Sequence, residues 1–153
     1  MPNWNAAMRL VFKTHAAIYR LTGGRIGANF NAPVLLLTTV GRKTGRARTW
    51  PLGYLRDGEN LVIVGSNGGK DVHPGWFWNL RANHEAVVQV GARTMRVRAE
   101  QAGPDEAARL WPRLVAQAPV WGTYRSKTSR QIPVVILRPI TDGRAARPEN
   151  HAG

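Results

Sequence analysis

The sequence contains no cysteine. Disulfide bonds, thiol nucleophiles and thiolate metal sites are therefore excluded, and cysteine usage gives no indication of secretion. No run of about 18 apolar residues occurs, so no transmembrane helix is expected. The first residues lack the basic start and apolar block of a signal peptide. These absences favour a cytoplasmic protein, and 153 residues are most simply one globular domain.

Acidic residues are also scarce, and none occurs before Asp57. The same N-terminal stretch carries nine lysines and arginines, and the whole chain has a formal net charge of +13. Such a surface attracts anions, whether nucleic acid, acidic lipid or a polyanionic small molecule. Composition alone does not choose among these partners.

The chain lacks a self-sufficient set of catalytic side chains. Its four histidines lie far apart and show no metal-ligand spacing, so no metal site is expected. No serine lies in a nucleophile elbow, and the few acids fall in predicted turns and helix starts. If the protein is an enzyme, a cofactor must therefore carry the reaction. His73, which precedes a proline at a predicted helix start, is interpreted as a capping or solvent-exposed residue.

The apolar pattern predicts a mainly β (α+β) protein. Short turns between the strands favour antiparallel pairing and a small six-stranded β-barrel decorated by helices. Strands are expected at residues 34–40, 48–55, 60–65, 86–90, 94–100 and 132–137. Helices are expected at residues 4–21, 73–83 and 104–116, and the stretch 119–130 is expected to be irregular.

The segment that joins the first two predicted strands is the most informative one. Gly41 and Gly45 bound it, let the backbone turn and bring N–H groups toward a ligand. Cations beside such amides favour a phosphate or carboxylate site, whereas a solvated basic turn is the simpler alternative. The cations of this hairpin, which has no acid, are Arg42, Lys43, Arg46 and Arg48.

Five motifs follow one another in a recognisable order. They are LLTTVGRKTG at residues 36–45, RTWPL at 48–52, SNGG at 66–69, HPGWFWNLRAN at 73–83 and TSRQIPV at 128–134. Together they resemble the deazaflavin-dependent nitroreductase family, group A of the flavin/deazaflavin oxidoreductases. The resemblance spans about residues 30–138. It implies a split β-barrel like that of FMN-binding proteins, over residues 25–140, and coenzyme F420, a deazaflavin with a phosphate-linked oligoglutamate tail.

The resemblance also implies roles for individual residues, carried over motif by motif. The phosphate and tail are expected at Arg42, Lys43, Thr44 and Arg48. The deazaflavin ring is expected against Thr49, Trp50, Pro51, Leu52 and Gly53, with Val64, Gly65, Ser66 and Asn67 at its edge and Gly75, Trp76, Phe77, Trp78 and Asn79 as the opposite wall. The acceptor is expected at Ala118, Trp121 and Tyr124, with Ser66 and Tyr124 as catalytic hydrogen-bond or proton donors.

The implied activity is hydride transfer from the reduced deazaflavin to an electron-poor acceptor, such as a quinone, an enone or an unsaturated lactone of the furanocoumarin type. Many relatives have lysine where this chain has Asn67, which removes one cation near the cofactor. Nitroimidazole-reducing relatives carry tyrosines where this chain has Ala118 and Trp121. Reduction of nitro prodrugs is therefore not expected.

Several alternatives remain open at this point. An FMN- or haem-binding split barrel would share the fold, and a membrane-associated carrier would bind coenzyme F420 without turnover. A nucleic-acid-binding barrel would explain the charge, but cations interleaved with exposed aromatics are not evident, so no nucleic acid partner is expected. Residues 1–24 are expected to form an amphipathic helix that packs on the barrel or meets an anionic membrane. The tail from 141 to 153 is expected to be disordered, and the protein to be a monomer or weak homodimer.

Overall fold

The computed structural model describes residues 33–141, which form seven strands and three α-helices. The predicted N-terminal helix, and all but the first residue of the predicted disordered tail, lie outside this range. No helix in the described part of the chain is long and apolar enough to cross a membrane. In chain order the elements are β1 (Val34–Val40), β2 (Ala47–Gly53), β3 (Leu55–Asp57), β4 (Asn60–Val64), the short 3-10 helix η1 (Asn67–Gly69), α2 (Gly75–Ala82), β5 (Glu85–Val90), β6 (Arg93–Gln101), α3 (Pro104–Gln117), α4 (Val120–Ser126) and β7 (Val134–Pro139).

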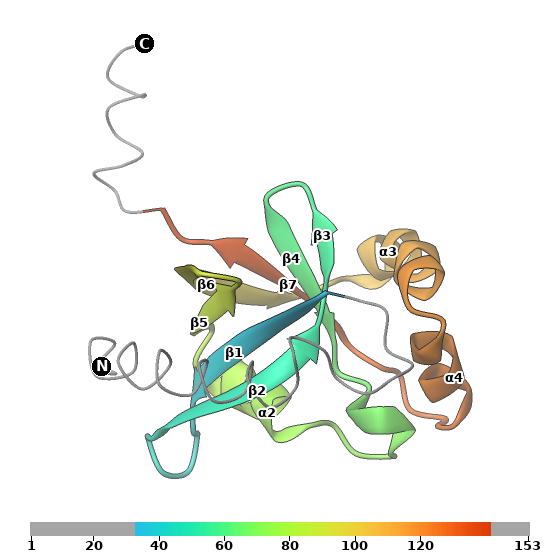
Figure 1. The fold of residues 1–153 in the computed structure, drawn as a ribbon. Helices are drawn as coiled ribbons and strands as arrows, with labels where there is room; N and C mark the ends of the chain where they lie inside the picture. The colour runs from blue at the N-terminus through green and yellow to red at the C-terminus, as the bar shows by residue number, and fades with distance from the viewer. Residues whose placement is uncertain (1–32, 142–153) are drawn as a thin grey trace.

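All seven strands belong to one antiparallel sheet with the order β2-β1-β5-β6-β7-β4-β3. The two outermost strands, β2 and β3, are consecutive in the chain and are separated only by Tyr54. The sheet must therefore curl enough to bring one end of each edge strand together at Tyr54, as Figure 1 shows. The curled sheet gives the mainly β, barrel-like architecture that the sequence predicts.

The single strand predicted over 48–55 is in fact two strands, which makes seven strands rather than six. The break is at Tyr54, where the chain leaves its pairing with β1 and begins to pair with β4. Its N–H donates to the carbonyl of Pro33 at 3.0 Å, and its own carbonyl accepts from the Gln117 side chain of α3 at 2.7 Å. The apolar pattern does not reveal this break. The residues before and after Tyr54 are both extended and differ only in the strand with which they pair.

Two apolar clusters lie on the two faces of the sheet. Alternating residues of β4 separate them: Leu61 and Ile63 point into the barrel, whereas Val62 and Val64 point out toward the helices. The barrel interior also receives Trp76 and Phe77 from α2. The outer cluster lies under α3 and α4, which Figure 1 shows together on one side of the sheet. The two clusters fix α2 and α4 independently, and the candidate site lies between these helices.

The helices agree with the sequence only in part. The predicted helix 104–116 is confirmed, with α3 ending at Gln117. The irregular segment expected over 119–130 is wrong, because residues 120–126 form α4. Gly122 and Thr123 are poor helix formers, so local propensity within the segment argues against a helix there. Packing overrides it, since Trp121 is only 3% exposed and lies in the outer cluster against α3.

Candidate functional site

The predicted cationic hairpin joins β1 and β2. The Gly41 N–H donates to the carbonyl of Arg46 and the Gly45 N–H to the carbonyl of Gly41, both at 2.7 Å. Gly45 has a positive φ of 71°, and a Cβ on Gly41 would lie 2.8 Å from the Thr44 hydroxyl oxygen, so both positions require glycine. The loop therefore has a defined shape, and its cationic side chains are exposed to solvent.

Asn79 of α2 holds this hairpin in place. Its side-chain oxygen accepts from the Arg42 backbone N–H at 3.1 Å and from the Arg42 guanidinium at 3.0 Å. Its NH₂ group donates to the Thr39 hydroxyl at 3.0 Å. Asn79 is 4% exposed, and its bond to Thr39 is buried, whereas its two bonds to Arg42 are partly buried. Within the described residues, the backbone amides of Lys43 and Thr44 make no hydrogen bond and face solvent beside the cations.

A slot of about 370 Å³ lies beside this assembly, between β2, the loop after β4, the start of α2 and α4. Three tryptophans and a tyrosine contribute to its wall, and no charged side chain of the described residues does. Ser66 and Tyr124 both line the slot, and neither hydroxyl donates to or accepts from another described residue. The lining residues are Trp50, Pro51, Leu52, Gly53, Val64, Ser66, Asn67, Gly68, Pro74, Gly75, Trp76, Trp121 and Tyr124.

Arg130 organises the loop that forms one wall of the slot. Its guanidinium donates to the carbonyls of Lys70 at 2.9 Å, Gly65 at 3.1 Å and Ser66 at 2.9 Å. It also lies 2.8 Å from Nδ1 of His73. One side chain, distant in sequence, thereby ties together the two ends of the segment that contains η1.

His73 is held in its neutral form by these surroundings. Burial, followed by the charges of Arg130 and Arg81, lowers its pKa below the ordinary value of 6.5. Because a guanidinium has no acceptor, Nδ1 of His73 must accept and the ring proton must lie on Nε2. The imidazole also packs against Phe77 and Trp78, with centroid distances of 4.7 and 5.3 Å. His73 is thus a structural partner of Arg130 rather than a cap or a solvated residue.

The loop also approaches α4 closely. Gly69 has a φ of 85°, and a Cβ there would lie 3.1 Å from Lys127 side-chain carbons and 3.2 Å from the Tyr124 carbonyl. Thr128 donates to the Asp71 carboxylate at 2.7 Å, which adds a second tie between the two segments. The position of Tyr124 relative to Ser66 therefore depends on glycine at residue 69.

Many of the residues expected to contact the cofactor or acceptor line this slot, and the others lie around it. Arg42, Lys43, Thr44 and Arg48 lie on the hairpin or the adjoining strand. Thr49 instead shares a hydrogen bond with the Thr38 hydroxyl at 2.8 Å, and the Gly65 N–H donates to the Pro133 carbonyl at 2.9 Å. The remaining ones are Asn79, which is the buried anchor; Phe77, which lines a different cavity; Trp78, which is exposed; and Ala118, which is buried in the outer cluster.

Sequence reasoning missed three contributors. Gly68 and Pro74 line the slot although no role was expected for them, and Arg130 shapes it from behind. Gly68 and Pro74 lie within or beside the motifs at 66–69 and 73–83, so proximity in the chain could have indicated them. For Arg130 the only signal is its place in the TSRQIPV motif, because its four partners are separated from it by 57 to 65 residues.

Comparisons with known proteins agree with this geometry. The family model described as F420H(2)-dependent quinone reductase matches residues 11–139. The F420H(2)-dependent quinone reductase Rv1261c of Mycobacterium tuberculosis is 44% identical over 133 residues, which cover 83% of this chain and 89% of that protein. A solved structure described as an F420-H2 dependent reductase (FDR-A) has a TM-score of 0.65 and 34% identity, over 69% of this chain and 94% of that chain. A further solved structure, described as a domain-swapped dimer, has a TM-score of 0.66 and 29% identity, over 86% of this chain and 99% of that chain.

The family match covers most of the chain, and the resemblance that the motifs indicate is confirmed. The similarity to the FDR-A reductase likewise supports a split-barrel-like fold. The chain therefore belongs to the F420H(2)-dependent quinone reductase family, and it is an oxidoreductase whose cofactor is reduced coenzyme F420.

Proposed function

We propose that the slot holds the deazaflavin ring and that the hairpin holds the phosphate and oligoglutamate tail. The donor set of the chain fits such a group. The slot offers flat aromatic surfaces and no charge, as an uncharged planar ring requires, while cations and unpaired amides lie outside it on the hairpin. Arg42 connects the two parts, because its guanidinium reaches the carbonyl of Gly75 at the slot wall at 3.4 Å.

The two unpaired hydroxyls in the slot are the observation that carries the catalytic proposal. Reduced coenzyme F420, when bound, supplies a hydride that, together with one proton, converts a quinone to its hydroquinone. Ser66 and Tyr124 would hydrogen-bond the acceptor oxygen on which negative charge develops, and Tyr124 could deliver the proton. The aromatic walls would align the two rings and exclude water. No metal is needed in this scheme.

The proposed acceptors are electron-poor ring compounds, namely quinones, enones and unsaturated lactones such as furanocoumarins. Trp121 lines the slot from α4, and a tryptophan gives a large stacking surface without a hydroxyl. Ala118 lies beneath it, where its carbonyl accepts from the Trp121 N–H at 3.0 Å. We therefore expect Ala118 to influence acceptor binding indirectly, by setting the position of Trp121. We also expect large polycyclic acceptors to be favoured over compact nitroimidazoles.

Steady-state kinetics with reduced coenzyme F420 and a naphthoquinone tests this scheme. Tyr124→Phe should lower turnover about 10- to 100-fold, and Ser66→Ala should lower it as well, with little change in cofactor affinity. Ser126→Ala is the matched control, because its hydroxyl bonds the Thr123 carbonyl on the exposed side of α4. If Tyr124→Phe and Ser66→Ala behave like this control, the two hydroxyls take no part in the reaction.

Two alternative functions, a barrel that binds FMN or haem and a carrier of coenzyme F420, make different predictions. An FMN- or haem-binding barrel would bind those groups at least as tightly as coenzyme F420, whereas we expect micromolar or better affinity for coenzyme F420 and much weaker FMN binding. A carrier would bind reduced coenzyme F420 and show no acceptor-dependent oxidation. Fluorescence titration with each cofactor, followed by addition of a quinone, separates all three.

We also propose a cytoplasmic monomer or weak homodimer whose residues 1–24 meet anionic membranes. The support is the sequence pattern of that segment, which carries Arg9, Lys13 and Arg20 and no acid. Co-sedimentation with anionic vesicles should be weak, salt-sensitive and lost when residues 1–22 are deleted. Binding that survives the deletion would assign the membrane contact to another surface.

A further inference from the structure

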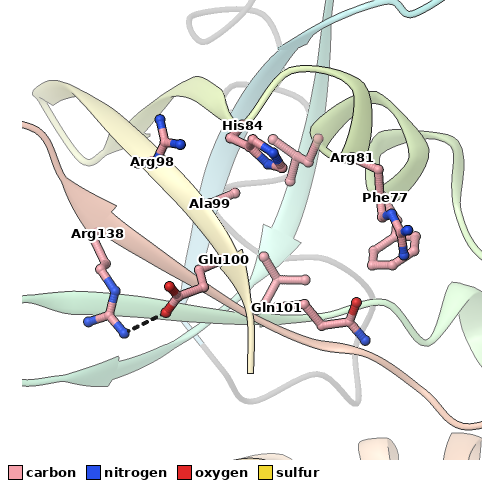
Figure 2. A pocket seen from close by; sticks show the side chains of 10 residues that line it. Phe77, Arg81, His84, Arg98, Ala99, Glu100, Gln101 and Arg138 are labelled. Atoms are coloured by element: carbon pink, nitrogen blue, oxygen red, sulfur yellow. Dashed lines mark hydrogen bonds and ion pairs between the residues drawn. The ribbon is translucent and has the colours of Figure 1, made fainter. Parts of the chain in front are cut away.

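A second and larger cavity, of about 560 Å³, is lined by other residues of α2 than the slot is. Figure 2 shows this cavity from close by. Consecutive residues of the helix line the two cavities, since Trp76 lines the slot and Phe77 lines this second cavity. Its volume is within the range of about 300–1,000 Å³ that is usual for small-molecule sites. The lining residues are Phe77, Leu80, Arg81, His84, Arg98, Ala99, Glu100, Gln101, Val135 and Arg138.

The cavity exists because β6 extends beyond its neighbour β5. The pairing of β5 with β6 ends where Glu85 meets Arg98, and only the bond from the Ala99 N–H to the His84 carbonyl, at 2.7 Å, continues it. The last residues of β6 pair with β7 alone, and on their other side the chain offers α2 instead of a strand. An open strand edge next to a helix leaves a groove that residues from both faces of β6 can line.

The floor of the cavity is apolar. Phe77, Leu80, Ala99 and Val135 belong to the barrel core, and each is at most 7% exposed. Ala99 contributes only a methyl group where its neighbours contribute larger side chains, so the floor is open at that point. A short hydrocarbon segment placed there would pack against these side chains and cover the small part of them that remains exposed.

The rim of the cavity is cationic. Figure 2 shows Arg138 joined to Glu100, and that pair, at 2.9 Å, neutralises the only acid of the rim. Arg98 makes no ion pair or side-chain hydrogen bond with another described residue. Arg81 likewise makes none, and its guanidinium lies over the Phe77 ring, 5.9 Å from the centroid. The His84 side chain makes no hydrogen bond or ion pair within the described residues either.

Arg98 differs from its arginine neighbours on the sheet. Two positions earlier on the same strand, Arg96 pairs with Glu85, and across the sheet Arg138 pairs with Glu100. Within the described residues, no carboxylate pairs with Arg98 or with Arg81, so both guanidinium groups that line the cavity are available to an anion.

We propose that this second cavity binds a free amphipathic carboxylate, such as a medium-chain fatty acid or an aromatic acid with an alkyl arm. The apolar part lies on the floor between Phe77, Ala99 and Val135, and the carboxylate accepts from Arg98 and Arg81. A carboxylate suits the site because charge-assisted bonds to guanidinium groups recognise it, and the apolar floor rejects small hydrophilic anions. The proposal is independent of the reductase activity, which belongs to the slot.

Calorimetric titration of the full-length protein with decanoate, below its micelle concentration, tests the proposal. We expect one site per chain that weakens with salt, and weaker binding of decanol at matched concentration. Arg98→Gln should weaken binding at least about fivefold, whereas Arg96→Gln, on the same strand but outside the cavity, should change it less than about twofold. Ala99→Leu, checked for an unchanged unfolding profile, should abolish binding by filling the floor.

Three results would overturn the proposal. The first is an absence of binding up to millimolar decanoate. The second is equal loss in Arg96→Gln and Arg98→Gln, which would mean that decanoate responds only to net charge. The third is displacement of decanoate by saturating coenzyme F420 together with full binding by Ala99→Leu, which would place the ligand in the slot.

Discussion

The two cavities lined by α2 differ in where their charge lies. The slot has no charged lining residue in the described part of the chain, and its cations are collected on the neighbouring hairpin. The second cavity carries its cations on its own rim, directly above an apolar floor. The slot therefore suits an uncharged ring whose anionic groups extend elsewhere, and the second cavity suits a ligand that joins charge and apolar surface over a short distance.

The largest expected effect comes from the hairpin cations. The double variant Lys43→Ala, Arg48→Ala should weaken coenzyme F420 binding by about 2–5 kcal/mol if both groups contact desolvated anionic oxygens. Both residues are exposed and make no ion pair with another described residue, so the melting temperature of the cofactor-free protein should barely move. Fluorescence titration measures the affinity. Decanoate binding should be unchanged, which would separate the two cavities directly.

A control of equal charge is available on β6. Arg93→Ala, Arg96→Ala removes the same two charges at a distance from the hairpin. If this variant loses as much cofactor affinity as the hairpin variant, the effect belongs to net charge. The hairpin would then be an ordinary solvated turn.

The next largest effect should come from Asn79→Ala. This change leaves the buried Thr39 hydroxyl without its donor and the partly buried Arg42 N–H without its acceptor, which costs about 1–3 kcal/mol. Urea unfolding should show that loss, and cofactor affinity should fall because the hairpin is no longer fixed to α2. Weakened cofactor binding with unchanged unfolding would instead mean that Asn79 touches the cofactor.

A smaller effect should appear in the pH dependence of folding stability, through the pKa of His73. The lowered pKa of His73 means that, below its ordinary value of 6.5, the unfolded chain binds a proton more readily than the folded one. Folding stability should therefore rise with pH between the folded-state pKa and 6.5. Urea unfolding across this range should show the slope in the native protein and lose it in His73→Gln, and an identical slope in both would assign it to another group.

The smallest effect should come from Asp57→Asn, whose carboxylate lines neither cavity. Arg109 and Arg113 hydrogen-bond its carboxylate and lower its pKa from 3.8 to about 2. The resulting stability is present above pH 3.8 and is lost as pH falls through about 2. Because these arginines are about half exposed, the neutral-pH loss should not exceed about 1 kcal/mol. Thermal unfolding measures it, and altered ligand binding would show that α3 communicates with the cavities.

Features set by neighbouring residues could be predicted from the sequence. The strand β1, the hairpin with its glycines, and the turn at Gly91 between β5 and β6 follow from short-range patterns. The resemblance adds the family, and with it the cofactor. Most of the residues that line the slot were also indicated, because they lie within the motifs.

Features set by distant contacts could not be predicted. Helix α4 forms although Gly122 and Thr123 disfavour it, because the burial of Trp121 outweighs propensity. The break at Tyr54 depends on which strands lie on each side of it. The role of Arg130 needs four acceptors from another part of the chain. The second cavity depends on where β5 stops relative to β6, which no local pattern encodes.

The central claim is that the slot and the hairpin together bind one cofactor molecule, and a crystal structure of the protein with coenzyme F420 tests it most directly. We predict ring density between Trp50 and Trp76, with the Ser66 and Tyr124 hydroxyls at its edge, and phosphate density within hydrogen-bonding distance of Lys43 or the hairpin amides. Ring density in the cavity lined by Phe77 and Arg98, or a phosphate remote from the hairpin, would contradict the account.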